Sequence, residues 1–176
     1  MAYNILFAGF GGQGVQFAAK VTTYSGMMSG SEVSLLPSYG PEMRGGTSNC
    51  AVRIDNKMIA SPIVNEPNLL MALNQPSYDK FVEKVEEGGT VIFDDSLIKR
   101  TDARTDISVY PIPATKLARE HGFQGLANMI ALGYMAKKTG FLSLDVLKEG
   151  LAKAVPASKA ALLGKNIEAL EFGFNY

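Results

Sequence analysis

Four glycines near the start of the chain are the residues whose type and spacing most directly predict a binding function. They lie between the apolar run 5–8, which is typical of a buried parallel strand, and a helical pattern that begins at Val15. A strand, a glycine turn and a helix N-terminus bring free N–H groups and the positive end of a helix dipole together, which suits an anion. The candidate binding residues in this turn are Gly9, Gly11, Gly12, Gln13 and Gly14.

Three of these glycines, Gly9, Gly11 and Gly14, have the spacing Gly-x-Gly-x-x-Gly and match the fingerprint of dinucleotide-binding proteins. That fingerprint also needs an acidic residue about 20 residues further on, at the end of the second strand, to bind the ribose hydroxyls. The second strand is predicted at 33–36 and is followed by Pro37 and Ser38, whereas Glu32 lies at its opposite end. A turn that only allows helix and strand to pack closely, and a stand-alone NAD(P)-binding enzyme, both remain open at this point.

A second candidate site follows the second predicted strand. Two prolines and three glycines in the ten residues 37–46 predict a loop. This loop carries side chains that make directional contacts, and Arg44 beside two glycines could present a guanidinium and free amides to a carboxylate or phosphate. Alternatively, Arg44 pairs with Glu42 and stiffens the loop. The candidate ligand-binding or interface residues here are Tyr39, Glu42, Arg44, Gly45 and Gly46.

The other potentially reactive residues favour structural roles. A single cysteine, Cys50, excludes an internal disulfide and a cysteine-ligated cluster, and a single histidine, His121, excludes a histidine-rich metal site. Cys50 lies in a predicted strand as a small buried residue, and His121 lies at the end of a short predicted helix. Asp94 and Asp95 could bind a metal or act in acid–base chemistry, but we interpret them as caps of the following turn. No catalytic residue and no metal ligand is therefore predicted.

Composition limits the class of protein. The chain has 176 residues, of which 47% are hydrophobic and 19% are charged, and this predicts one domain over 1–176 with a sizeable core. Its 17 acidic and 17 basic residues give no electrostatic reason to expect nucleic acid or an anionic membrane as a partner. No apolar run approaches the ~20 residues of a membrane span, and there is no signal-peptide pattern, so we expect a cytoplasmic protein.

Apolar patterns predict an alternation of strands and helices. A three-layer α/β/α, Rossmann-like domain with a mainly parallel, mixed sheet follows from it. We expect Lys57 to Ala60 to pair back on the strand at 47–54 as a hairpin, and Pro111 and Pro113 to end the last strand. The predicted strands are 5–8, 32–36, 47–54, 68–73, 90–93 and 107–110, and the main later helices are 114–120, 128–139, 144–152 and about 160–170.

Two details of the C-terminal part carry further expectations. Gly133 in the middle of the helix at 128–139 costs about 1 kcal/mol against alanine, which predicts a close neighbour at that position. The aromatic tail 172–176 is expected either to fold back on the protein or to contact a partner.

Taken together, the two loops Gly9-Phe-Gly-Gly-Gln-Gly14 and Ser38-Tyr-Gly-Pro-Glu-Met-Arg-Gly-Gly46 resemble the γ subunit of 2-oxoacid:ferredoxin oxidoreductases. The similarity runs from Asn4 to the last helix, and it extends to one internal domain of the single-chain pyruvate:ferredoxin oxidoreductases. The Pro-Ser-Tyr-Gly-Pro-Glu form of the second loop resembles the 2-oxoglutarate and pyruvate enzymes, and the short chain favours the 2-oxoglutarate synthase type. Pyruvate or branched-chain 2-oxoacid versions of the complex remain alternatives.

The resemblance implies a multisubunit enzyme in which this chain is a non-catalytic subunit, inactive when isolated. The holoenzyme would use thiamine diphosphate with Mg²⁺, iron–sulfur clusters and coenzyme A, and would pass electrons to ferredoxin. The sequence has neither a Gly-Asp-Gly motif for the thiamine cofactor nor enough cysteines for a cluster, so no cofactor is expected in this chain. The implied partners are α and β subunits that bind thiamine diphosphate and a ferredoxin-like cluster subunit. The isolated chain could self-associate as a homo-oligomer.

Overall fold

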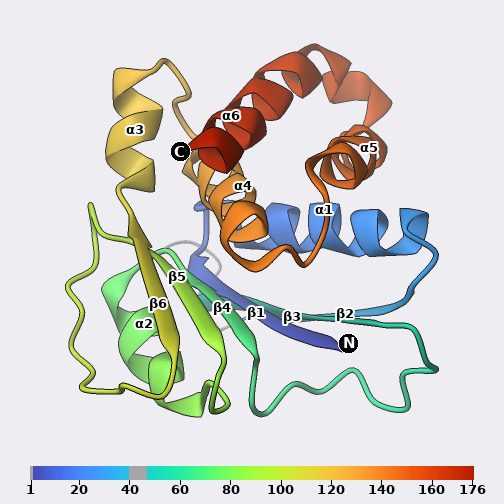
Figure 1. Cartoon of the computed structure of the whole chain (residues 1–176). Coiled ribbons are helices and arrows are strands. Elements are labelled where there is room, and N and C mark those ends of the chain that lie inside the picture. The colour runs from blue at the N-terminus through green and yellow to red at the C-terminus, as the bar shows by residue number, and fades with distance from the viewer. Residues whose placement is uncertain (1, 40–46) are drawn as a thin grey trace.

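The computed structural model describes residues 2–39 and 47–176, and in them a single sheet lies between layers of helices (Figure 1). The sheet has six strands in the order β2-β3-β1-β4-β5-β6. Along the chain the elements are β1 (Tyr3–Phe10), α1 (Val15–Met28), β2 (Glu32–Tyr39), β3 (Thr47–Asp55), β4 (Leu69–Ala72), α2 (Gln75–Phe81), a 3-10 turn (Val82–Lys84), β5 (Thr90–Asp94), β6 (Ser108–Ile112), α3 (Ala114–Glu120), α4 (Ala127–Thr139), α5 (Leu144–Ala154), a second 3-10 segment (Ala157–Leu162) and α6 (Leu163–Asn175).

The pairing of the strands confirms a mainly parallel, mixed sheet. β1, β4, β5 and β6 are parallel neighbours, with Phe7 opposite Met71 and Ile92 opposite Tyr110. β3 runs antiparallel to both β1 and β2. Parallel strands are covered on both faces, and β1 and β4 accordingly consist of unbroken apolar runs whose central residues are buried.

The helices cover the two faces of the sheet unequally. α1 and α4 lie on one face with α5 and α6 stacked on them, whereas α2 lies on the opposite face (Figure 1). The larger core surrounds Phe7, Met71 and Met129, and the smaller one surrounds Leu70, Tyr78 and Phe93. The predicted three-layer α/β/α class is confirmed. No helix in the described residues is both long enough and apolar enough to span a membrane.

The predicted hairpin at 57–60 is wrong. These residues form no strand, and β3 instead pairs on one side with β2 and on the other with β1. Met58 in this segment is 89% exposed. The register of β2 places Val33 opposite Ile54, so the partner that buries apolar side chains against the core is the strand before β3, not the segment after it.

Two prolines do not end strands as expected. Pro37 lies inside β2, opposite Cys50, and Pro111 lies inside β6, opposite Phe93. Both strands are edges of the sheet, where a residue without an N–H can face solvent without breaking a ladder hydrogen bond. The second strand therefore continues to Tyr39, three residues beyond its predicted end.

The close neighbour predicted for Gly133 is the last helix. A β-carbon built on Gly133 would collide with the carbonyl oxygen of Leu170 in α6, and one built on Gly173 would collide with that of Ile130 in α4. The two helices therefore cross with backbone against backbone at a pair of glycines. The aromatic tail folds back as part of α6, with the ring of Phe172 at 4.6 Å from that of His121.

We expect Gly133→Ala to destabilise the chain by about 2–4 kcal/mol, because the added methyl group forces two packed backbones apart. Gly164→Ala is the matched control: Gly164 also lies in α6, has no atom within 4 Å of its β-carbon position, and is expected to be neutral or slightly stabilising. Urea unfolding followed by circular dichroism measures both. Equal stability of the two variants would refute the close crossing of α4 and α6.

A buried carboxylate, Asp102, holds the segment between β5 and β6 against α2. The side chain of Asp102 is 0% exposed and accepts hydrogen bonds from Tyr78 Oη, from Arg100 Nε at 3.1 Å and from the backbone N–H of Arg104 at 3.0 Å. Burial opposes ionisation of this carboxyl, but these hydrogen bonds outweigh it and lower its pKa from 3.8 to about 2. Burial, and then the hydrogen bond to Asp102, raise the pKa of Tyr78.

Asp102→Asn is expected to lower the free energy of unfolding near neutral pH by about 1–2 kcal/mol, because the charge-assisted hydrogen bonds are lost. The folded-state pKa is depressed, so this contribution is complete above the unfolded value of 3.8 and is lost as the pH falls through about 2. The difference from wild type should therefore shrink by about half at about pH 3. Asp55→Asn is the control, since Asp55 accepts only one bond of 3.3 Å from Lys57. A pH-independent difference would contradict the assignment.

Candidate functional site

The glycine turn joins the carboxyl end of β1 to the start of α1, as predicted. Gly12 and Gly14 have φ angles of 100° and 75°, in the left-handed region that favours glycine. Gly9 must be a glycine for a different reason. A β-carbon at this position would lie 2.7 Å from Gln13 Oε1 and 2.9 Å from Val15 Cγ2. The turn is thus both tight and closely packed. Gly11 lies within it.

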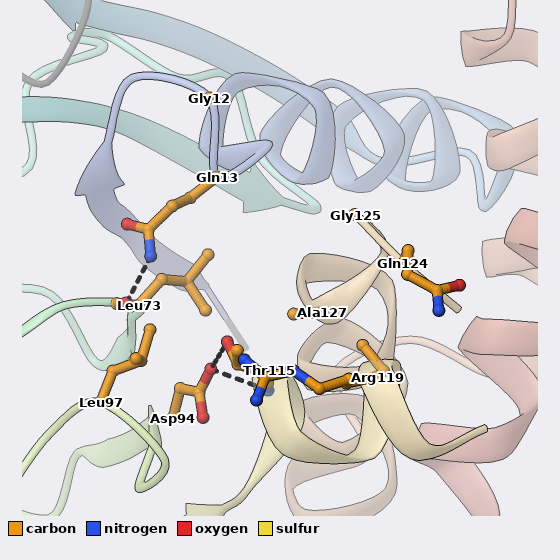
Figure 2. A pocket seen from close by; sticks show the side chains of 11 residues that line it. Gly12, Gln13, Leu73, Asp94, Leu97, Thr115, Arg119, Gln124, Gly125 and Ala127 are labelled. Carbon is orange, nitrogen blue, oxygen red and sulfur yellow. Dashed lines mark hydrogen bonds between the residues drawn. The ribbon is translucent and has the colours of Figure 1, made fainter. Parts of the chain in front are cut away.

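The side chain of Gln13 points back into the protein and joins the ends of two parallel strands (Figure 2). Its Oε1 accepts hydrogen bonds from the backbone N–H of Phe10 at 2.7 Å and from Asn74 Nδ2 at 3.2 Å. Its Nε2 donates to the backbone carbonyl of Leu73 at 2.7 Å. One carboxamide therefore satisfies a backbone group of the last residue of β1 and one just beyond β4.

The position of this carboxamide bears on the dinucleotide interpretation. β1 connects through α1 toward the β2 side of the sheet, whereas β4 connects through α2 to β5 on the other side. The gap between β1 and β4 is thus the point where open α/β sheets bind their ligands. Here Gln13 lies in that gap and uses the N–H of Phe10. The geometry disfavours a nucleotide seated in the turn.

The strand ends that flank the second candidate loop lie beside the glycine turn. Gly9 pairs with Ser48 in β3, and the same Ser48 pairs with Tyr39 at the end of β2. Gln16 in the first turn of α1 reinforces this junction by donating to Ser48 Oγ at 3.1 Å and to the carbonyl of Asn49 at 3.0 Å. The remaining candidates of the second loop, Glu42, Arg44, Gly45 and Gly46, lie outside the described residues.

A cavity of about 350 Å³ opens beside the turn, on the side of β5 and α3 (Figure 2). Gly12 and Gln13 form one wall, Leu73 and Leu97 a second, and Ala118 and Arg119 of α3 a third. The cavity therefore combines an apolar interior with a cationic side chain, Arg119, at its rim.

Asp94 lies in this cavity's wall and has the capping role predicted for it. It is 1% exposed and accepts hydrogen bonds from the backbone N–H groups of Ser96 at 3.1 Å and Thr115 at 3.0 Å, and from the hydroxyl of Thr115. It thereby ties the end of β5 to the start of α3. Burial and the nearby charge of Asp94 raise the pKa of Asp95. The described residues contain no group of three His, Cys, Asp or Glu side chains that could hold a metal ion.

The environments of Cys50 and His121 agree with structural roles. Cys50 is fully buried, and desolvation raises the pKa of its thiol to about 12, which keeps it protonated and unreactive. His121 lies at the C-cap of α3, as expected, and stacks on Phe172.

Residue types alone did not identify the partners that organise this edge. Leu73 contributes its backbone carbonyl to the bond with Gln13. Asn74 donates to Gln13, and it also caps α2 by accepting a 2.9 Å hydrogen bond from the N–H of Ser77. The Asn74-Gln75-Pro76 sequence signals a helix start, but no local pattern connects it to a turn sixty residues earlier.

Comparison with known proteins identifies the family. The family model described as pyruvate ferredoxin/flavodoxin oxidoreductase matches residues 4–176. The chain belongs to this family. The predicted resemblance is thereby confirmed over the range from which it was inferred.

Two relatives show how this domain occurs in longer and shorter chains. The ketoisovalerate oxidoreductase subunit VorA of Methanothermobacter thermautotrophicus is 36% identical over 97% of this chain, which spans only 35% of that relative's length. The 2-oxoglutarate synthase subunit KorC of Methanocaldococcus jannaschii is 33% identical over 99% of this chain and 93% of its own. The same sequence unit is therefore a part of one relative and nearly the whole of the other.

Solved structures agree with the fold. The γ subunit of a keto/oxoacid ferredoxin oxidoreductase from Geobacter sulfurreducens has a TM-score of 0.83 at 28% identity, covering 98% of this chain and 96% of its own. A 2-oxoglutarate:ferredoxin oxidoreductase chain from Magnetococcus marinus has a TM-score of 0.87 at 24% identity, with 30% of that chain covered. The latter likeness concerns the fold alone.

Gln13→Ala is expected to destabilise the chain by about 2–3 kcal/mol, because it leaves the Phe10 N–H and the Leu73 carbonyl without their partner. Gln124→Ala is the control, since Gln124 lines the same cavity, is exposed and makes no hydrogen bond to another described residue. Urea unfolding gives both values, and faster amide exchange at Phe10 should accompany the first. If the two variants were equally stable, the bridge would not be structurally important.

Proposed function

We propose that this chain is the γ-type, non-catalytic subunit of a multisubunit 2-oxoacid:ferredoxin oxidoreductase. The complex would decarboxylate a 2-oxoacid on thiamine diphosphate, transfer the acyl group to coenzyme A and pass electrons through iron–sulfur clusters to ferredoxin. Thiamine diphosphate, Mg²⁺ and the clusters would be held by α, β and ferredoxin-like chains. We place the complex in the cytoplasm, a reducing compartment in which a single free cysteine stays a thiol.

The observation that carries this proposal is the end-to-end correspondence with γ-type subunits. The chain covers 96% of the Geobacter γ subunit and 93% of the Methanocaldococcus KorC subunit, so the whole of it is accounted for by one known type of subunit. Its own residues are consistent with a supporting role, because Asp94 is occupied in capping and Cys50 is an inert buried thiol.

The edge formed by the two loops is the surface that we assign to contact with the catalytic chains. The ends of β1 and β2 and the start of β3 lie together there, and Gln16 fixes their junction. A backbone held by Gln13 and left-handed glycines is preorganised, so docking on it costs little conformational entropy. Arg44 remains our candidate for a carboxylate or phosphate, including those of a coenzyme A bound nearby.

For the substrate we propose 2-oxoglutarate, with branched-chain 2-oxoacids and pyruvate as the alternatives. The single-domain relatives with more than 30% identity are named 2-oxoglutarate synthase subunits. The ketoisovalerate relatives match slightly better in sequence, at 36% and 35%, but are about three times as long as this chain.

The competing function is a stand-alone NAD(P)-binding enzyme. The bridging position of Gln13 counts against it, as does the absence of an acidic residue at the end of β2 among the described residues.

Co-purification of the tagged chain from its native cell tests the proposed function. We expect thiamine-binding and cluster-binding chains to co-elute, and the eluate to reduce a viologen dye with coenzyme A and one of 2-oxoglutarate, ketoisovalerate or pyruvate. Arg44→Ala should lower this activity or the yield of partner chains at least about tenfold, as for loss of a charge-assisted contact. Lys99→Ala, an exposed residue of another loop, is the control. Recovery of the chain alone with a bound nucleotide would instead support the NAD(P) alternative.

A further inference from the structure

The cavity beside the turn adjoins the gap in which Gln13 lies and shares Gln13 and Leu73 with it. Its walls come from the turn, the ends of β4 and β5, helix α3 and the segment before α4, so five parts of the chain converge on it. Its volume of about 350 Å³ is at the small end of the range of roughly 300–1,000 Å³ for ligand pockets. It therefore suits a small molecule.

The interior of this cavity is mainly apolar. Leu73, Leu97, Ala118 and Ala127 contribute side chains to it, and Leu97 is 47% exposed at its mouth. The carboxylate of Asp94 also lies in the wall, but it already accepts three hydrogen bonds from Ser96 and Thr115. These bonds leave the inner part of the cavity without an unsatisfied polar group, so an apolar group can enter it first.

Two polar side chains at the rim have donors to offer. Arg119 and Gln124 both line the cavity, and neither makes a side-chain hydrogen bond or ion pair with another described residue. Arg119 presents a planar guanidinium that carries donors only, which matches a carboxylate. The negative charge of Asp94 at the inner wall requires that an anionic group stay at the rim.

We propose that this cavity binds a small carboxylic acid with an apolar body, its carboxylate on Arg119 and its body against Leu73 and Ala127. The proposal does not depend on the proposed function, since it rests only on the lining of the cavity. Uncharged analogues would lack the contact to Arg119, and acids without an apolar body would bury too little surface to bind.

Amide resonances of the full-length chain titrated with isovalerate provide the test. We expect saturable shifts at residues that line the cavity, and far weaker binding of 3-methylbutan-1-ol and of acetate. Arg119→Gln should weaken isovalerate binding about tenfold or more, as for loss of a charge-assisted hydrogen bond. Ala127→Leu, which fills the cavity from its partly exposed wall, should abolish binding without loss of fold.

Lys116→Gln is the matched control, because it removes the same charge from the same helix at a residue that does not line the cavity. Its affinity for isovalerate should equal that of wild type within about twofold, a difference too small to indicate a direct contact. Shifts that do not saturate, or equal losses in the two charge variants, would overturn the proposal.

Discussion

The carboxamide of Gln13 is the interaction on which the geometry of the functional edge depends. Its acceptor binds the N–H of Phe10 and its donor binds the carbonyl of Leu73, so it fixes the segments after β1 and β4 relative to each other. In a parallel sheet the backbone groups beyond the carboxyl ends have no ladder partner, and an unsatisfied buried group costs about 1–3 kcal/mol. A ligand, water or side chain must supply the missing partners. Here a side chain from the turn itself does so, and this determines both the shape of the turn and where a cavity can remain.

Close contacts at glycines transmit this fixed position to the helical layer. A β-carbon on Gly14 would collide with the side chain of Asn128, whose Nδ2 donates to the carbonyl of Gly14 at 3.1 Å and thereby ties the turn to α4. α4 in turn crosses α6 with backbone contact at Gly133 and Gly173. Packed interiors respond to small shifts as units rather than deforming locally. The turn, α4 and α6 should therefore behave as one rigid body, with the loop edge held at one end of it.

The sequence was sufficient for the class of fold and for the position of the glycine turn, because both follow from local patterns. Apolar runs such as 5–8 and 90–93 identify buried strands, and a glycine turn before a helix has few alternatives. The errors at 57–60, Pro37 and Pro111 have a common cause: whether a segment pairs, and whether a proline is tolerated, depends on which strands lie at the edges. That order is set by contacts between residues far apart in the chain. The bridge from Gln13 to Leu73 and Asn74 spans about sixty residues and was invisible for the same reason.

A glycine turn with a dinucleotide spacing is therefore weak evidence for a nucleotide, and the residue types inside the turn decide the matter. The spacing of Gly9, Gly11 and Gly14 permits a tight reversal whatever occupies it, whereas the glutamine at position 13 reaches the neighbouring strand and binds the N–H of Phe10 and the carbonyl of Leu73. These internal bonds hold the turn in one conformation. A surface of this kind is suited to docking a protein, because docking gains from preorganisation. The nucleotide-like spacing of the glycines is thus compatible with a scaffold subunit, because the Gln13 carboxamide holds the turn in a fixed conformation.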